Sequence, residues 1–135
     1  MRVLIDSNIL ISVVYSKGSI PHKAFLKVVE PPYQALICEV SLEEFRRVYN
    51  RKFPDKIHIF ERFIATALPV IEIIPVPLSL HSDEGKIRDT DDRPILRAAI
   101  QAGADILLTG DKDFLESDVS NPKIVTAVQF LQTSP

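Results

Sequence analysis

Short apolar runs alternate along the chain with longer stretches in which apolar side chains recur every three or four residues. The short runs are continuously apolar or β-branched, which is typical of strands buried on both faces of a sheet. We expect five such strands, over residues 3–5, 35–38, 70–76, 105–109 and 123–126. The longer stretches predict helices over residues 8–14, 21–29, 41–51, 54–68 and 92–103, with a short final helix near Phe130. This alternation predicts a three-layer α/β/α sandwich with a central, mainly parallel sheet of about five strands.

Several helix ends carry sequence signals. Ser41 is followed three residues later by Glu44, which is the spacing of a capping box, so we expect Ser41 to cap a helix. Pro54 is suited to the first turn of the next helix, and Gly103 to the end of the helix that begins at Asp92. Residues 78–91 are polar and show no period, so we expect an irregular segment there.

Aspartates stand where two of the predicted strands end. Asp6 directly follows the first strand, and Asp111 and Asp113 follow the fourth. A third group precedes the helix that leads into the fourth strand: Asp89, Asp91 and Asp92. In open α/β sheets, ligands bind outside the carboxyl ends of the strands, at the point where strand order reverses. If the first and fourth strands are neighbours, these carboxylates converge on one crevice.

Each of these aspartates also has a purely structural interpretation. Asp6 can be a turn or cap residue, and Asp91 or Asp92 is suited to cap the helix that begins RPILRAAI. Asp111 and Asp113 can cap a following short helix. Capping explains single residues, whereas one ligand site explains all three groups together.

The helix at 41–51 contributes a further acid. Its buried stripe is formed by Leu42, Phe45, Val48 and Tyr49. At about 100° per residue, Glu44 lies roughly 110° and Glu43 roughly 150° from the centre of that stripe. Glu44 is therefore the acid nearer the crevice, and we expect Glu43 to point outward, where it can pair with Arg47.

A crevice of carboxylates without cysteine or histidine ligands favours a hard divalent cation. Neighbouring anionic oxygens repel one another unless a cation or a shared proton is present. Mg²⁺ and Mn²⁺ prefer oxygen ligands, so we expect one or two of these ions, which would support hydrolysis of a phosphodiester. Asn8 and Thr109 lie at the same strand ends and can orient a water or a carboxylate, whereas the three histidines lie in unrelated segments.

The composition is that of one globular domain, which we expect to span residues 1–135. The single cysteine, Cys38, excludes an internal disulfide framework. No apolar stretch is long enough to cross a membrane, so we expect a cytoplasmic protein that does not contact membranes.

The net charge of −2 hides an uneven distribution. Without five crevice acids (Asp6, Glu44, Asp92, Asp111 and Asp113), 13 acidic and 16 basic residues leave a net charge of +3. A nucleic-acid partner is therefore compatible with the charge, although charge alone is too weak to bind it. Four basic residues can follow a phosphate backbone or simply form a solvated helix face: Arg46, Arg47, Arg51 and Lys52. We expect Arg47 and Arg51 to point away from the flank that carries Glu44.

Three segments together resemble the PIN domain: VLIDSNILIS, SLEEFRRV and RDTDDRPILRAAIQAGADILLTGDKDFL. The chain is most similar to the PIN-domain toxins of toxin–antitoxin systems, relatives of the VapC-like ribonucleases, from Val3 to about Leu131. This resemblance implies an α/β/α sandwich with a carboxylate site for Mg²⁺ or Mn²⁺. It also implies endonucleolytic cleavage of single-stranded RNA.

The resemblance also implies roles for particular residues. The implied catalytic acids are Asp6, Glu44, Asp92 and Asp111. The implied metal ligands are Asp6, Asp92 and Asp111, with Asp89 and Asp113 as close companions, and the supporting polar residues are Asn8 and Thr109. The implied partners are an antitoxin protein and a second copy of the chain, in a homodimer or higher homo-oligomer that could use the helices between Ser41 and Leu68.

Two other functions compete with a nuclease. The first is a phosphatase that uses Asp6 as its nucleophile, although such enzymes usually carry a second aspartate where this chain has Asn8. The second is a PIN-like module that binds a partner without catalysis, and the full set of acids argues against it. A nucleotide-binding domain is less suitable, because no G-x-G-x-x-G or P-loop sequence follows the first strand.

Overall fold

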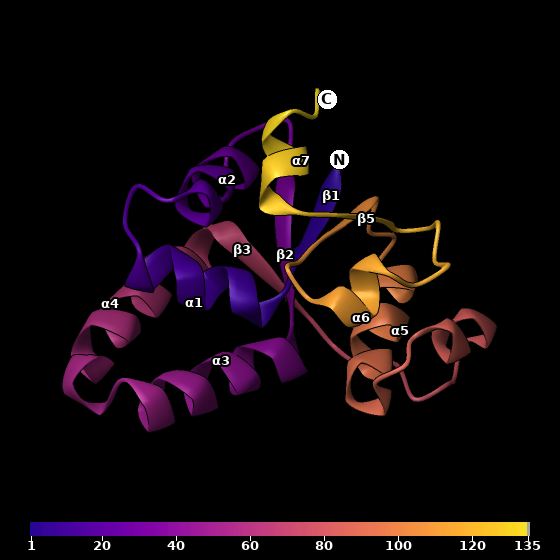
Figure 1. The fold of residues 1–135 in the computed structure, drawn as a ribbon, viewed down its shortest axis with the longest axis horizontal. Helices are drawn as coiled ribbons and strands as arrows, with labels where there is room; N and C mark the ends of the chain where they lie inside the picture. Colours follow the sequence, from indigo (N-terminus) through magenta and orange to yellow (C-terminus); the bar gives the residue numbers. More distant parts are fainter. Residues whose placement is uncertain (135) are drawn as a thin grey trace.

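The computed structural model describes residues 1–134, in which five strands form one central sheet (Figure 1). The strands are β1 (Arg2–Ile5), β2 (Gln34–Cys38), β3 (Ile71–Ile74), β4 (Ile106–Leu108) and β5 (Lys123–Val125). Their order in the sheet is β3-β2-β1-β4-β5, and every neighbouring pair is parallel. The chain therefore builds outward from β1 in both directions, and the strand order reverses between β1 and β4.

Helices cover both faces of the sheet, as Figure 1 shows. One face packs against α1 (Ser7–Tyr15), α2 (Ile20–Val28), α3 (Glu39–Lys52), α4 (Ile57–Ala67) and α7 (Ala127–Leu131). The other face packs against α5 (Arg93–Gln101) and α6 (Lys112–Leu115). These three layers confirm the predicted α/β/α sandwich. Of the helices described between residues 1 and 134, none is both long enough and apolar enough to cross a membrane.

Alternate residues of the central strands face the two helical layers. In β1, Val3 and Ile5 pack into the core that contains α1, whereas Leu4 packs into the core that contains α5. β4 follows the same alternation, with Leu107 on the α5 side. Burial on both faces explains why these strands are continuously apolar in the sequence.

The carboxyl ends of β1 and β4 lie level with each other. Ile5 is paired with Leu108 in the parallel register. One residue further on, the backbone N–H of Asp6 donates a hydrogen bond to the carbonyl oxygen of Leu108 at 3.0 Å. The residues that follow the two strands, Asp6 and Thr109, therefore start side by side at the edge where the crevice was predicted.

The predicted helix start at Ser41 is wrong. α3 begins at Glu39, directly after β2, with Cys38 in the capping position. Ser41 therefore lies inside the first turn, where its Oγ atom is buried without a hydrogen-bond partner within residues 1–134. Glu39 in the first turn ties α3 to the segment after β3, because its carboxylate accepts a hydrogen bond from the backbone N–H of Val76 at 3.0 Å. The capping box between Ser41 and Glu44 does not form, because the helix is already under way at both positions.

The segment between β3 and α5 is more ordered than its sequence predicts. It contains two short 3₁₀ helices, η3 (Ser82–Lys86) and η4 (Thr90–Asp92). Glu84 is buried and accepts hydrogen bonds from Nε and Nη2 of Arg97, both at 2.9 Å. Nη1 of Arg97 donates to the carbonyl oxygen of Pro77 at 3.1 Å. This arginine therefore ties the segment to α5.

Candidate functional site

Asp6 lies at the base of the crevice, where β1 ends and α1 begins. Its side chain is only 4% exposed and accepts three hydrogen bonds. The backbone N–H of Ser7 donates to Oδ1 at 2.8 Å, and this contact caps α1. Oδ2 accepts from the Thr109 hydroxyl at 2.7 Å and from the Asn8 amide at 3.2 Å. The carboxylate is therefore fixed in one orientation by neutral donors.

Asn8 and Thr109 join the ends of β1 and β4. The Thr109 hydroxyl accepts a hydrogen bond from the backbone N–H of Asp111 at 3.0 Å. The Asn8 side-chain oxygen accepts one from the backbone N–H of Gly110 at 3.2 Å. Each side chain therefore contacts both Asp6 and the loop after β4. Thr109 makes both contacts through its hydroxyl oxygen, whereas Asn8 contacts Asp6 with its amide nitrogen and the loop with its amide oxygen. This network sets the position of Asp6 relative to the acids that follow β4.

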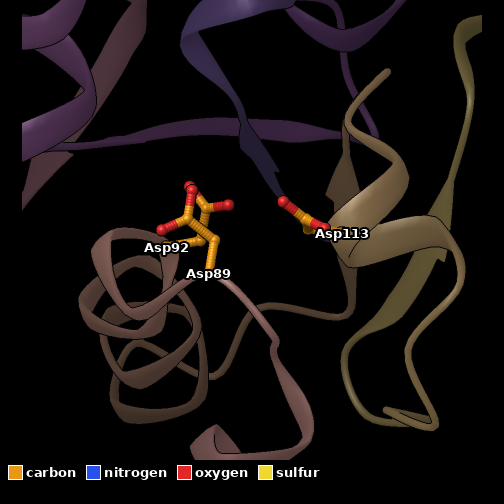
Figure 2. A group of neighbouring side chains, drawn as sticks. All are labelled: Asp89, Asp92 and Asp113. Atoms are coloured by element: carbon orange, nitrogen blue, oxygen red, sulfur yellow. The ribbon is translucent and has the colours of Figure 1, made fainter.

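Three aspartates from two segments of the chain face one another across the crevice in Figure 2: Asp89, Asp92 and Asp113. One carboxylate oxygen of each lies within 4.8 Å of those of the other two. Asp89 precedes η4, Asp92 ends it, and Asp113 lies in the first turn of α6. Oxygen atoms brought this close by η4 and α6 can coordinate a single divalent cation.

Asp92 lacks a partner for one of its oxygen atoms. Oδ2 is buried and has no hydrogen-bond partner among residues 1–134. Burial raises the pKa of Asp92 above its ordinary value of 3.8, and the neighbouring Asp111, Asp89 and Asp6 raise it further. A cation would supply the missing partner and offset the repulsion between the carboxylates. The donor set therefore fits a hard divalent metal ion.

The pKa of Asp6 is raised in the same way. Burial raises it from 3.8 to about 6, and hydrogen bonds from Thr109 and Ser7 lower it in part. The negative charges of Glu44 and Asp111 also raise the pKa of Asp6. Asp6 thus lies within electrostatic range of acids from α3 and from the loop after β4, as expected of a shared site.

A polar cavity of about 490 Å³ opens beside these acids. Glu43, Glu44 and Arg47 line it from α3, and residues 89–92 line it from the opposite side. The expectation that Glu43 and Arg47 point away from the crevice is therefore wrong. The cavity lies along the solvent flank of α3 and not only beside its buried stripe. Residues that are further from the stripe than Glu44 therefore reach the cavity as well. Glu43 and Arg47 form no ion pair within 4.0 Å in the described part of the chain.

The sequence model of the PIN domain matches residues 2–113. This range contains β1 through β4 and every candidate acid of the crevice. The chain belongs to the PIN domain family. The predicted family is thereby confirmed. No curated protein sequence matches the chain.

Solved structures show the same fold as this PIN domain. VapBC2 from Rickettsia felis, bound to a DNA fragment from its promoter, is 16% identical over 93% of this chain and 98% of that chain, with a TM-score of 0.71. A toxin–antitoxin complex from Klebsiella pneumoniae is 25% identical over 93% of this chain and 97% of that chain, with a TM-score of 0.65. VapC20 from Mycobacterium tuberculosis, a toxin that cleaves the sarcin–ricin loop, is 16% identical over 84% of this chain and 93% of that chain, with a TM-score of 0.59.

Like Asp6, two further acids of this PIN domain combine capping with a place in the crevice. Asp89 accepts a hydrogen bond from the backbone N–H of Asp91 at 2.9 Å, and Asp111 accepts one from that of Asp113 at 2.9 Å. Asp89, rather than Asp91 or Asp92, therefore supplies the capping oxygen before α5. Capping and a ligand role are not exclusive, because a carboxylate has a second oxygen atom.

The other predicted basic residues do not reach the cavity of this PIN domain. Arg46, Arg51 and Lys52 are exposed and are absent from its described lining. Arg46 lines a different groove, beside Tyr49 on α3. Of the four predicted phosphate-contacting residues, Arg47 is the one placed at the crevice.

Arg88 is a residue of the PIN site that the sequence pattern does not reveal. It directly precedes Asp89, and its Nη2 atom lies 3.0 Å from Oδ1 of Asp113. It falls within the stretch that shows no period, so no helical or strand face predicts where its side chain points. The nearness of Arg88 to Asp89 in the sequence is the one available signal.

Proposed function

We propose that this protein is a metal-dependent endoribonuclease that hydrolyses single-stranded RNA. The observation that carries the proposal is the approach of Asp89, Asp92 and Asp113 within 4.8 Å at the carboxyl edge of the sheet, within electrostatic range of the buried Asp6. Membership of the PIN domain family supports nuclease chemistry, and one structure of the same fold is a toxin that cleaves RNA.

The acids are suited to hold one or two Mg²⁺ or Mn²⁺ ions. Asp92 is the central candidate ligand, because its unpartnered Oδ2 atom lies among the other carboxylates. Asp89 and Asp113 complete the oxygen set within 4.8 Å, and Asp6 and Asp111 are close enough to raise the pKa of Asp92. When bound, such an ion polarises a phosphoryl oxygen and lowers the pKa of a water molecule.

The remaining residues would position the reacting groups. Thr109 and Asn8 hold the Asp6 carboxylate in a fixed orientation, so that it need not reorganise during the reaction. Glu44 lines the cavity opposite residues 89–92, where it would orient the attacking water. Arg47 lines the same cavity and would contact a backbone phosphate.

This arrangement argues against the phosphatase alternative. A nucleophilic Asp6 would need an accessible carboxylate oxygen, yet its side chain is 4% exposed and both oxygen atoms accept hydrogen bonds. Asn8, which stands where a phosphatase usually has its second aspartate, donates to Asp6 instead of facing a leaving group. Direct hydrolysis by water fits this geometry better.

We also infer that the chain acts as the toxin of a toxin–antitoxin pair in the cytoplasm. Structures of the same fold from Rickettsia felis, Klebsiella pneumoniae and Salmonella typhimurium are complexes of this kind. The expected partner is an antitoxin protein, and a homodimer through α3 and α4 is a further expectation.

The proposed function is tested by a cleavage assay with an Asp92→Asn variant. The purified protein is incubated with single-stranded RNA, double-stranded RNA and DNA, with Mn²⁺ or with EDTA. We expect Mn²⁺-dependent cleavage of single-stranded RNA, and a loss of at least about 100-fold in Asp92→Asn, because one charged ligand is removed.

Asp55→Asn is the matched control for this assay. Asp55 is exposed in the 3₁₀ turn Pro54–Lys56, away from the crevice, so its amide variant should cleave RNA at the wild-type rate. Because Oδ2 of Asp92 accepts no hydrogen bond within residues 1–134, its amide variant should remain folded. Full activity of folded Asp92→Asn would contradict the proposed site.

A further inference from the structure

Arg88 stands at the edge of the carboxylate site, on the side of α6. Its Nη2 atom lies 3.0 Å from Oδ1 of Asp113 and 3.5 Å from Oε1 of Glu116. The side chain is nevertheless 64% exposed. Asp113 in turn lies within 4.8 Å of Asp89 and Asp92. The guanidinium group is therefore next to the acids without being enclosed by them.

The ion pairs hold Arg88 in place while leaving much of its binding capacity free. Arginine has five N–H donors in a planar fork that matches phosphate oxygens. Both ion pairs use Nη2, so they leave Nε and Nη1 available to a ligand. A guanidinium held by one nitrogen atom loses less conformational entropy when the others bind a ligand.

The neighbouring arginines are occupied by the fold. Nε of Arg93 donates to the carbonyl oxygen of Ile87 at 2.9 Å, and Arg97 is paired with the buried Glu84. Arg88 precedes both in the chain and carries an exposed charge instead. Arg93 and Arg97 therefore make structural contacts, whereas Arg88 faces solvent at the site.

An RNA strand across the crevice meets acids at its centre, so its flanking phosphates need positive groups at the rims. Arg47 lines the cavity from α3. Arg88 stands on the opposite side, beside α6. A strand whose reacting phosphate lies at Asp89 and Asp92 would therefore have a cation on each side.

We propose that Arg88 binds a phosphate of the RNA backbone on the α6 side of the carboxylate site. The inference rests on the proposed ribonuclease function. Arg88 makes this contact equally in the substrate complex and in the transition state, because the phosphate that it binds is not the one that reacts. Its removal should therefore raise KM and leave kcat nearly unchanged.

The test compares Arg88→Ala and Arg88→Lys with the wild type, on a fluorescent single-stranded RNA with Mn²⁺. In Arg88→Ala we expect a KM about 10-fold higher, a kcat within about 2-fold, and a salt slope for RNA binding that is smaller by about 0.7. Arg88→Lys should recover part of the loss, since it keeps the charge but not the fork. Arg62→Ala, which removes an exposed arginine from α4, is the matched control and should leave KM unchanged.

A Mn²⁺ titration by calorimetry separates this function from a purely local effect on Asp113. If Arg88 only positions Asp113 or competes with metal for it, Arg88→Ala will change the Mn²⁺ affinity or kcat and leave KM and the salt slope unchanged. That result would overturn the inference. If the wild type cleaves no RNA, the proposed function fails, and fluorescence anisotropy with the same RNA then decides the inference: weaker binding by Arg88→Ala than by Arg62→Ala supports it, and equal binding overturns it.

Discussion

The carboxylate of Asp6 is almost fully buried among other acids, and the groups that donate hydrogen bonds to it are neutral. Burial without a positive partner disfavours the ionised form, which is why its pKa rises to about 6. Asp92 shows the same effect, and among the neighbouring charges Asp111 raises its pKa most. At the scale of single residues, the metal-free site is therefore strained electrostatically, and the strain is greatest when all the acids are ionised.

Stability of the metal-free protein should therefore fall as the pH rises from about 4 to about 6. Because the pKa of Asp6 is higher in the folded chain than the ordinary 3.8, the folded state holds the proton more tightly than the unfolded state. The stabilisation present at low pH is lost as Asp6 ionises, and it amounts to about 3 kcal/mol. The raised pKa of Asp92 extends the loss to higher pH. Denaturant unfolding in EDTA at a series of pH values measures this slope.

Asp6→Asn serves as the control for this pH dependence. It removes the titrating group, so its unfolding free energy should vary less with pH over the same range, whatever its absolute stability. A metal-free wild type whose stability rises across this interval, or a variant with the wild-type slope, would show that Asp6 does not carry the effect.

At the scale of elements, one ion pair anchors the segment that carries half of the site. Arg97 on α5 holds Glu84 in η3 and the carbonyl oxygen of Pro77. Hydrogen bonds from Arg97, and one from the backbone N–H of His81, lower the pKa of Glu84 to about 2. The contribution of this pair is therefore present above the ordinary pKa of Glu84 and is lost as the pH falls toward 2. This ion pair anchors the segment from η3 to η4, and that segment carries Arg88, Asp89 and Asp92 at the crevice.

Arg97→Lys should loosen this segment selectively. Lysine keeps the charge but cannot donate to Glu84 and Pro77 in the same planar geometry. We expect a Tm lower by several degrees, faster amide hydrogen exchange in residues 82–92, and Mn²⁺ affinity weakened several-fold. Exchange in β1 and β4 should be unchanged. Hydrogen-exchange mass spectrometry, with Lys23→Arg as an exposed control on α2, distinguishes local loosening from global destabilisation.

The parts of the fold that follow from local patterns could be predicted from the sequence. Continuous apolar runs identify β1 and β4 because both faces of each are buried, and the residues that follow them, Asp6 and Thr109, then fall at one edge. The start of α3 at Glu39 could not be predicted, because the Ser41–Glu44 spacing is a stronger local signal than a direct passage from strand to helix.

The orientation of exposed side chains depends on tertiary neighbours, which no periodicity encodes. Arg47 and Glu43 face the cavity because the start of α5 lies beside the solvent flank of α3. Arg88 is placed by the fold of η3 and η4, which Arg93 and Arg97 of α5 tie down through Ile87 and Glu84. The predicted acids come together because the topology gathers strand ends, whereas the basic rim depends on how the loops pack.

At the scale of the whole molecule, two layers of helices and the reversal of strand order between β1 and β4 create one carboxylate crevice with a basic group on each side. The central claim is that this crevice hydrolyses RNA with a metal-activated water. Such a reaction does not use the 2′-hydroxyl of the substrate.

The most direct test is the chemistry of the cleaved ends. After Mn²⁺-dependent cleavage of a single-stranded RNA of defined sequence, the end groups are identified by mass spectrometry. Hydrolysis at the carboxylate site predicts a 5′-phosphate and a 3′-hydroxyl, and cleavage should persist when the nucleotide at the scissile position carries 2′-deoxyribose. Products that end in a 2′,3′-cyclic phosphate, together with complete resistance of the deoxy substrate, would contradict the claim.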